Sequence, residues 1–431
     1  MELDKKVVKS WYMYDWANSV YNLVINTSIF PIYYTAVTLN PNGSDKVNFF
    51  GFDIVNSVLY SYAISISYLL AAIILPILSG IADYTGQKKK YLRIFTTLGS
   101  IACMGMFFFT SESLEWGILC VVIASLGYSS GLVFYDAFLP EIAPSHLTDK
   151  ISAKGYSYGY AGSALMLIAS LVLITFYDSF GFPDKGMATR VVFLLVGVWW
   201  IGFAQIPLKH LPNNVFNRKP TGKVLMNGYL ELKKVFISVK KLPDLRKYLG
   251  AFFFFNMGVQ TIMILATLFG TKELKLGADQ LIPVILIIQF VGILGATLFA
   301  KISDKKGNIF SLQLMIFIWV GICVFAYTVT TVNQFYVVAV LVGLVMGGIQ
   351  ALARATFSKL IPKDTVDHAS YFSFFDVTFH ISVVLGTFSY GLIEQLTGSM
   401  RNSTLALGSY FIIGFIILFF VKMPKPNHET S

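Results

Sequence analysis

Two ionisable residues, Asp376 and His380, lie four positions apart in an otherwise apolar stretch near the C-terminus. On a helix this spacing places both side chains on one face, with Ser373 one turn earlier. A histidine changes its charge near neutral pH, and a neighbouring carboxylate can share its proton. The pair therefore predicts a proton-coupling site. The alternatives are a hydrogen-bonded pair that only fixes its helix, and a direct substrate contact.

An arginine and an aspartate, Arg354 and Asp136, lie near the ends of two other apolar stretches. A guanidinium in a dry site forms paired hydrogen bonds with a carboxylate or a phosphate. Its partner is a substrate carboxylate, or it is Asp136 or Asp376 of the same chain. We interpret Arg354 and Asp136 first as a gate or structural ion pair. Arg354 and Gln350, one turn before it, are also substrate-binding candidates.

Amide side chains form two further polar faces within apolar stretches. The first follows spacings of three and four residues, as on one face of a regular helix: Asp15, Asn18, Asn22 and Asn26. The second contains Asn256 and Gln260, and Gln289 lies in the next apolar stretch. Amides in a low-dielectric helix bundle must find partners. They either bond to the backbone of packed helices or line a cavity for a polar solute.

These residues belong to a chain of 431 residues that is 55% hydrophobic and 13% charged. Soluble globular proteins carry about 25% charged residues, and disordered chains are polar. A helix that spans a membrane needs about 20 apolar residues. Such segments lie near 16–37, 54–79, 91–110, 116–139, 152–176, 188–208, 246–270, 279–301, 309–330, 334–358, 368–392 and 404–422. The sequence therefore predicts an all-α membrane protein with twelve transmembrane helices.

One long polar connection, residues 209–245, divides these segments into six and six. We expect an N-terminal six-helix bundle over 1–208 and a C-terminal six-helix bundle over 246–431. Within the connection, apolar residues recur at helical spacing opposite lysines, which predicts an amphipathic helix lying on the membrane face. A solvated linker helix is the equal alternative. The positions concerned are Lys223, Val224, Leu225, Tyr229, Leu232, Lys233, Lys234, Val235, Phe236, Lys240 and Lys241.

Lysine and arginine are distributed unequally over the connections between the segments. The chain has 33 of these residues and a net charge of +10. If the N-terminus is cytoplasmic and the number of helices is even, most of them lie on the cytoplasmic side. The exceptions are Lys46, Lys185, Arg190, Lys272, Lys275 and Arg401. This positive-inside bias predicts cytoplasmic termini and explains the net charge without a nucleic-acid partner.

A weak internal repeat relates the two halves. The pattern Asp-x-x-Gly follows an apolar segment at 83–86 and again at 304–307. Asp136 likewise occupies the place in the first half that Arg354 occupies in the second. Two pseudo-symmetric six-helix bundles related by an axis along the membrane normal are typical of one transporter architecture.

The loop segment from Gly80 to Lys89 resembles the signature between helices 2 and 3 of the major facilitator superfamily, although Tyr84 stands where a basic residue is usual. The runs 11–19, 30–33, 135–141 and 350–358 resemble one branch of it, the family containing the fungal vacuolar amino-acid effluxer and its bacterial relatives. The likeness covers almost the whole chain. It implies a secondary transporter with the twelve-helix major facilitator fold and, less specifically, amino-acid export.

The resemblance also implies roles for single residues. Helices 1, 4, 7 and 10 of the superfamily line a central cavity, which makes several polar residues substrate-binding candidates: Asn18, Asn22, Asn26, Asn256, Gln260, Gln350 and Arg354. The aspartate of the loop signature caps a neighbouring helix and holds the outward-facing state, and a solvated loop charge is the alternative. The gating candidates are Asp15, Asp83, Lys88, Lys89, Asp136, Glu141 and Arg354.

Signals for enzymatic chemistry are weak. The runs 127–131 and 155–159 fit G-x-S-x-G, but a nucleophile elbow needs a turn from a strand to a helix, and both lie in apolar helical context. The phosphate-binding loop of an ATP-driven pump does not occur. The three cysteines have no metal-ligand spacing. We therefore expect no catalytic residue, no cofactor and no metal.

Together these patterns predict a secondary active transporter that moves a small polar solute, an amino acid or similar zwitterion, by alternating access with proton coupling. Its expected partners are membrane lipid, the small-molecule substrate and protons, without nucleic acid, and we expect a monomer. If the protein is bacterial, its expected place is the inner membrane. The alternatives are an intramembrane enzyme or a transporter acting on lysolipid or lipid-linked material, and a non-transporting receptor or scaffold.

Overall fold

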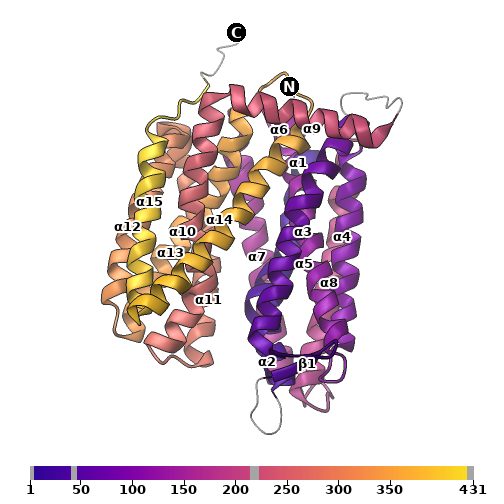
Figure 1. Ribbon diagram of the computed structural model, residues 1–431, viewed down its shortest axis with the longest axis vertical. Helices are drawn as coiled ribbons and strands as arrows, with labels where there is room; N and C mark the ends of the chain where they lie inside the picture. The colour runs from indigo at the N-terminus through magenta and orange to yellow at the C-terminus, as the bar shows by residue number, and fades with distance from the viewer. Residues whose placement is uncertain (1–3, 40–45, 214–222, 425–431) are drawn as a thin grey trace.

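The computed structural model describes residues 4–39, 46–213 and 223–424, and most of them are helical (Figure 1). Eleven of the described helices are long and apolar enough to cross a membrane. The first helix adds a further crossing, because its three consecutive pieces continue without a break from residue 5 to residue 38. Each piece alone is shorter than the roughly 20 residues that a crossing needs. The all-α, twelve-helix fold expected from the sequence is confirmed.

The helices fall into two halves that stand side by side (Figure 1). The first half contains α1 Lys5–Val20, the π-helix η1 Tyr21–Ile29, α2 Phe30–Thr38, α3 Asn56–Thr85, α4 Lys88–Gly105, the short 3-10 helix η2 Met106–Phe108, α5 Leu114–Asp136, α6 Leu139–Ile142, α7 Thr148–Thr175 and α8 Lys185–His210. The second half contains α10 Pro243–Glu273, α11 Ala278–Lys306, α12 Asn308–Thr328, α13 Val332–Leu360, α14 His368–Thr397 and α15 Met400–Leu418. Between them, α9 Val224–Lys241 lies across one end of the molecule.

Local capping explains where several helices begin and end. The carboxylate of Asp4 accepts hydrogen bonds from the amides of Lys6 and Val7, at 2.8 and 3.2 Å, so α1 begins well before the predicted start at residue 16. The helix α3 continues through the loop signature and ends at Gly86, whose φ of 69° is the left-handed conformation that glycine adopts most easily. A similar left-handed glycine, Gly398, ends α14.

A small hairpin that the sequence analysis did not predict precedes α3. Strand β1, Lys46–Phe49, pairs antiparallel with β2, Phe52–Val55. Phe50 and Gly51 form the turn with positive φ values of 49° and 87°. The hairpin lies at the end of the molecule opposite α9 (Figure 1), which we call the hairpin end.

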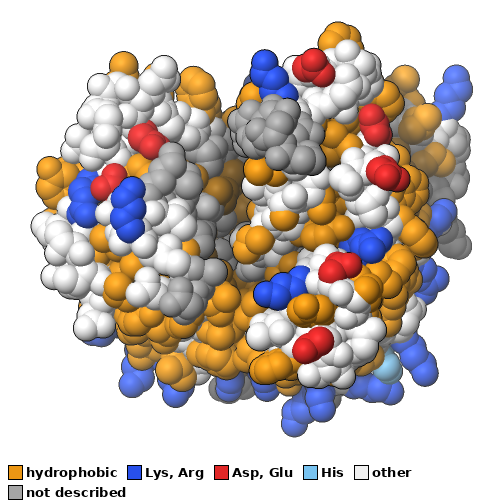
Figure 2. Space-filling view, turned by 90° about the horizontal axis from the view of Figure 1, so that it is seen from below, with side chains coloured by type: hydrophobic (Ala, Val, Ile, Leu, Met, Phe, Trp, Pro, Cys, Tyr) orange, Lys and Arg blue, Asp and Glu red, His pale blue; other side chains and the backbone are white. Residues whose placement is uncertain are grey.

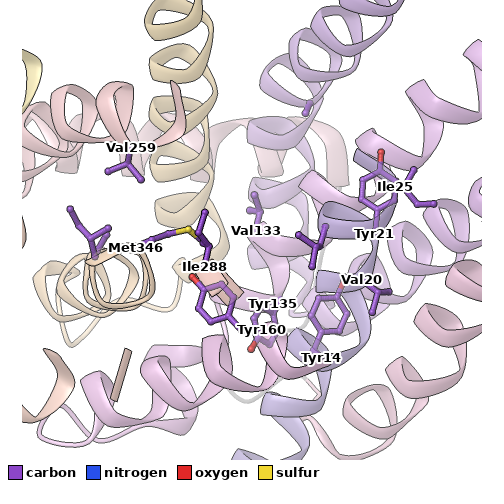
Figure 3. Packing of buried hydrophobic residues seen from close by; sticks show 14 of the residues in the cluster. Tyr14, Val20, Tyr21, Ile25, Val133, Tyr135, Tyr160, Val259, Ile288 and Met346 are labelled. Carbon is purple, nitrogen blue, oxygen red and sulfur yellow. The ribbon is translucent and has the colours of Figure 1, made fainter. Parts of the chain in front are cut away.

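The start of α1 and the end of α15 lie at the α9 end, which we call the terminal end (Figure 1). The two halves touch along a seam in which α7 packs against α11 and α13, and α14 packs against α3 and α5. Viewed from the hairpin end, a crevice separates the two halves (Figure 2). Deeper in the molecule, Tyr160 of α7 lies beside Ile288 of α11 and Met346 of α13 (Figure 3). The halves are therefore closed at the terminal end and parted toward the hairpin end.

Candidate functional site: a central cavity and its seam

A cavity of about 270 Å³ lies between the two halves. Both halves contribute to its wall, with residues of η1, α3, α5 and α7 facing residues of α10, α11, α13 and α14. Six amide side chains line it, namely Asn22, Asn26, Asn256, Gln260, Gln289 and Gln350. Tyrosines and apolar residues form most of the remaining wall. Apart from Asp376 and His380, the described wall of the cavity is therefore polar through neutral groups and apolar elsewhere.

The amides of the cavity are held in position by hydrogen bonds to one another and to neighbouring hydroxyl groups. Asn26 donates to Asn22 at 3.2 Å within η1. Gln260 donates to Asn256 at 3.3 Å, and the amide nitrogen of Asn256 donates to Ser382 at 2.7 Å. From the other half, the hydroxyl group of Tyr160 donates to Gln350 at 2.9 Å. These bonds orient the amides and still leave donors and acceptors for a ligand.

The expected continuous polar face on the first helix is wrong. Asn22 and Asn26 line the cavity, but Asn18 is buried within the first half, and its amide atoms have no hydrogen-bond partner among the described residues. Asp15 points instead into the seam. The π-helix η1 starts at Tyr21, three residues after Asn18, and changes the number of residues per turn. The spacing argument assumed one regular helix throughout.

Asp376 and His380 both line the cavity from α14. Asp376 Oδ2 lies 3.1 Å from His380 Nε2, without the geometry of a hydrogen bond. The imidazole stacks on the ring of Tyr68, with a centroid distance of 4.8 Å. Within the described chain, neither ring nitrogen of His380 nor Oδ2 of Asp376 makes a hydrogen bond. The predicted pair is therefore present in the cavity wall, and it contains three buried polar atoms that no described residue hydrogen-bonds.

Arg354 is buried in the seam and does not line the cavity. Its guanidinium lies 3.0 Å from Asp136 Oδ1 and 3.3 Å from Asp15 Oδ2. It also donates to the hydroxyl and the carbonyl oxygen of Ser152, each at 3.0 Å. All of these partners belong to the first half, whereas Arg354 belongs to the second. The expectation that Arg354 contacts substrate is corrected, because internal carboxylates already occupy its hydrogen-bonding positions.

Aromatic rings surround this ion cluster. The guanidinium carbon of Arg354 lies 4.7 Å from the ring centroid of Trp11 and 4.3 Å from that of Tyr156, within the range of cation–π attraction. The hydroxyl group of Tyr135 donates to Asp15 Oδ2 at 2.7 Å. A Cβ atom at Gly155 would approach Asp15 Oδ2 to 2.5 Å, so the close packing of α7 here requires glycine. The cluster is buried, and each of its charged groups has a partner of opposite charge.

A second contact of the seam joins α3 to α14. The carboxylate of Asp83 accepts hydrogen bonds from the backbone amides of Ala369 and Ser370, at 3.1 and 2.7 Å. These amides belong to the first turn of α14, where helix N–H groups lack internal partners and the helix dipole favours a negative charge. Asp83 thus lies at the N-terminus of a neighbouring helix in the other half, as the loop signature led us to expect.

The other charged gating candidates separate into two places. Lys88 forms an ion pair with Glu141, and His368 Nδ1 lies 2.9 Å from Glu141 Oε1, so this cluster also joins the two halves. Lys89 does not take part in it. Its ammonium group donates to the carbonyl oxygen of Leu211 at 2.8 Å, within the first half.

The helix α9 contacts both halves at the terminal end. Asn227 donates to the hydroxyl group of Tyr84 at 2.8 Å, which gives a structural use to the residue that departs from the superfamily signature. At the other side, Lys234 lies 3.2 Å from Asp367. Partial burial works against the charge of Lys234, but the carboxylates of Asp367 and Glu231 outweigh it and raise its pKa. Thus α9 bridges α3 and the start of α14.

The sequence analysis missed a further contact of the seam. Asp149, in the first turn of α7, accepts hydrogen bonds from Ser303 at 2.7 Å and from Asn308 at 2.8 Å. Its Oδ1 also lies 2.7 Å from the ammonium group of Lys359. The repeat pointed instead to Asp304, which is exposed. The only available signal was an acidic residue in the first turn of an apolar helix, which is common enough to be uninformative.

Two helical halves with a polar cavity between them define a transporter of the major facilitator class. Solved structures show the same fold. The human organic anion transporter MFSD10 superimposes with a TM-score of 0.74 at 10% sequence identity, covering 97% of this chain and 100% of that one. The transporter FucP in its outward conformation gives a TM-score of 0.68 at 13% identity, covering 97% and 98%.

The sequence places the chain more narrowly. The family described as vacuole effluxer Atg22 like matches residues 3–431, and the chain belongs to this family. An uncharacterized MFS-type transporter of Bacillus subtilis, YxiO, is 31% identical over 430 residues, covering 99% of this chain and 96% of the relative. Autophagy-related protein 22 of Eremothecium gossypii is 25% identical over 401 residues, covering 85% and 76%. The protein is therefore a multi-pass membrane transporter and not an enzyme.

Proposed function

We propose that this transporter moves a small zwitterion, an amino acid or a close analogue, by alternating access. The observation that carries the proposal is the cavity between the halves, lined by six amides and one carboxylate–imidazole pair. Neutral amides bind polar groups without the cost of desolvating a fixed charge. The apolar remainder of the wall suits an aliphatic side chain. Membership of an effluxer family supports export as the direction.

The proposed working unit is a pair of rocking bundles, residues 1–208 and 246–431, joined by the connection 209–245. The excess of lysine and arginine at the connections near the terminal end supports a cytoplasmic location for that end. In this orientation the seam is a closed cytoplasmic gate, and the cavity is reached from outside. The gate consists of Arg354 with Asp15 and Asp136, and of Asp83 with α14. We propose that the chain works as a monomer, in the inner membrane if it is bacterial.

Proton coupling is proposed at Asp376 and His380, because both residues line the cavity and keep buried polar atoms without hydrogen-bond partners in the described chain. A carboxylate and an imidazole in contact provide a site that holds one proton and changes its charge when it loses it. A proton bound there changes the charge of the cavity wall. Since few ionisable groups can be tolerated inside a membrane protein, such a pair is a reasonable coupling site.

The test uses full-length protein in proteoliposomes with radiolabelled leucine as the probe. Leucine flux driven by an imposed pH gradient is compared with leucine counterflow at equal pH on both sides. Asp376→Asn is expected to abolish the pH-driven flux and to leave counterflow measurable at leucine concentrations that saturate the variant, because exchange needs no net proton movement. Asp364→Asn changes an exposed loop carboxylate and serves as the matched control.

Two results would contradict the proposal at different levels. If Asp376→Asn leaves pH-driven flux and counterflow unchanged, the proton-coupling role is wrong. If the wild-type protein moves neither leucine nor any other neutral amino acid, the proposed substrate class is wrong, whereas the transporter class rests on the family and the fold.

A further inference from the structure

The cavity has an unbalanced set of charges. Its described lining contains one carboxylate, Asp376, and one imidazole, His380, but no lysine and no arginine. The guanidinium that could bind an anion, Arg354, is fully engaged in the seam by Asp15, Asp136 and Ser152. A carboxylate of a ligand therefore meets no fixed cation in the described wall, whereas an ammonium group of a ligand meets an anion.

Asp376 lies in the cavity wall, and part of its side chain is accessible there. Its side chain is 13% exposed, and Oδ2 accepts no hydrogen bond from the described residues. His380 is nine-tenths buried or more, and both of its ring nitrogens are equally unpartnered. Unpaired polar atoms at this depth are costly unless a ligand, a proton or water completes them.

Aromatic rings lie on the same part of the wall. Tyr68 stacks on His380 at 4.8 Å, and Phe375 and Phe379 line the cavity from the same helix as Asp376. A carboxylate with aromatic faces around it is the usual environment for an ammonium group, which gains both a charge-assisted hydrogen bond and cation–π attraction.

The neutral groups lie on other helices. Asn256 and Gln260 belong to α10, and Asn22 and Asn26 belong to η1 in the opposite half. Each primary amide has two N–H donors, and the hydrogen bonds described above use at most one of them in Asn26 and in Gln260. These donors can bind the carboxylate of a zwitterion, but without the charge that would hold an anion by itself.

We propose that Asp376 binds the ammonium group of the substrate, so that the cavity accepts amines and zwitterions and rejects organic anions of the same shape. This inference rests on the proposed function, because it concerns the same cavity. It fixes the orientation of the bound ligand. The ammonium group lies at α14, and the other polar end lies toward the amides. It also separates this cavity from that of a fold neighbour that is an organic anion transporter.

The experiment uses three probes that share one aliphatic chain. Leucine carries both charged groups, isopentylamine lacks the carboxylate, and 4-methylpentanoate lacks the ammonium group. Binding to the purified full-length protein in lipid nanodiscs is measured as the concentration dependence of its melting temperature. We expect leucine and isopentylamine to stabilise the protein, and 4-methylpentanoate to have no effect at the same concentrations.

Variants locate the ammonium site. Asp376→Asn is expected to lower the affinity for leucine and isopentylamine roughly ten- to hundredfold, as for the loss of a charge-assisted hydrogen bond. Asp376→Glu keeps the carboxylate and should keep the preference for the amine over the acid. Asp364→Asn should bind all probes as the wild type does. The melting temperature without ligand shows for each variant whether it is folded.

Each outcome decides the inference. Equal or tighter binding of 4-methylpentanoate compared with isopentylamine overturns it, and so does undiminished leucine binding by a folded Asp376→Asn protein. Binding of isopentylamine without binding of leucine supports the ammonium site and contradicts the amino-acid proposal. If leucine binds but the amine and the acid bind equally, the amino-acid proposal stands and the ammonium site is wrong. Absence of binding by all three probes overturns both.

Discussion

The seam at the terminal end and the cavity in the centre use polar residues in opposite ways. In the seam, Arg354 has two carboxylate partners and Asp83 has two backbone amides, so the charged groups are paired inside the protein. In the cavity, Asp376 and His380 keep polar atoms without hydrogen bonds from the described chain. A buried charge that is paired inside the protein holds two elements together. A buried polar group without such a partner is costly until a ligand, a proton or water completes its hydrogen bonds.

This comparison leads to a general expectation for the effects of mutations. Changes in the seam should alter stability and the balance between conformations. Changes in the cavity should alter binding and transport, with little cost in stability.

The largest effect is expected from Arg354→Gln. It leaves Asp15 and Asp136 buried without their cation, which costs on the order of 3–5 kcal/mol. We expect a lower melting temperature and loss of leucine counterflow. The charge swap Asp136→Arg with Arg354→Asp rebuilds one ion pair but places a second carboxylate near Asp15, so we expect partial recovery. Activity of the double variant no higher than that of either single variant would argue against a pairing role.

The second-largest effect is expected from Asp83→Ala, which we compare with Asp149→Ala at another contact of the seam. Asp83→Ala removes the acceptor of two backbone amides that cannot move, and should favour the open seam by about 2–3 kcal/mol. Asp149→Ala should cost only about 1 kcal/mol, because its donors are side chains and Lys359 already donates to Asn308 at 2.9 Å.

Spin labels on opposite halves can measure this difference. Arg93 and Lys363 are exposed, and the native Cys103, Cys120 and Cys323 are buried. Electron–electron distance measurements between labels at 93 and 363 should show longer distances for Asp83→Ala than for Asp149→Ala. Equal distance distributions for the two variants would contradict the expectation that losing an acceptor costs more for backbone donors than for side-chain donors.

In the cavity, Gln260→Met is expected to leave the melting temperature nearly unchanged. The substitution keeps the volume and removes one hydrogen bond, to Asn256, worth about 1 kcal/mol or less. Leucine counterflow should fall at least several-fold, because an amide of the wall is lost. A large drop in melting temperature with normal flux of the surviving protein would mean that this amide is structural.

The smallest effect is expected from Tyr84→Phe. The change removes the hydroxyl group that accepts from Asn227, a bond worth about 0.5–1.5 kcal/mol, and touches nothing in the cavity. Hydrogen exchange of the α9 amides should become faster while leucine counterflow stays normal. Unchanged exchange would show that the remaining contacts hold α9 without it.

The sequence predicted the elements better than their contacts. Hydrophobic segments of sufficient length predicted the twelve-helix fold, and the loop signature led to the partnership of Asp83 with a neighbouring helix. Asn18 was misplaced because a π-helix cannot be recognised from residue spacing. Asp149 was missed because its partners come from three helices of the other half, which no local pattern brings together. Arg354 was assigned to both regions, and only the three-dimensional arrangement decided between them.

One helix, α14, belongs to both regions. Its first turn is held by Asp83, and Asp376 and His380 follow on the same helix, with Asp376 about 9 Å along the axis from Ser370 at 1.5 Å per residue. A helix of this length is stiff. A substrate that binds Asp376 and displaces α14 would therefore also displace the backbone amides that donate to Asp83. In the proposed mechanism, substrate binding at Asp376 and opening of the seam at Asp83 would therefore be coupled through α14 itself, without intermediate side chains.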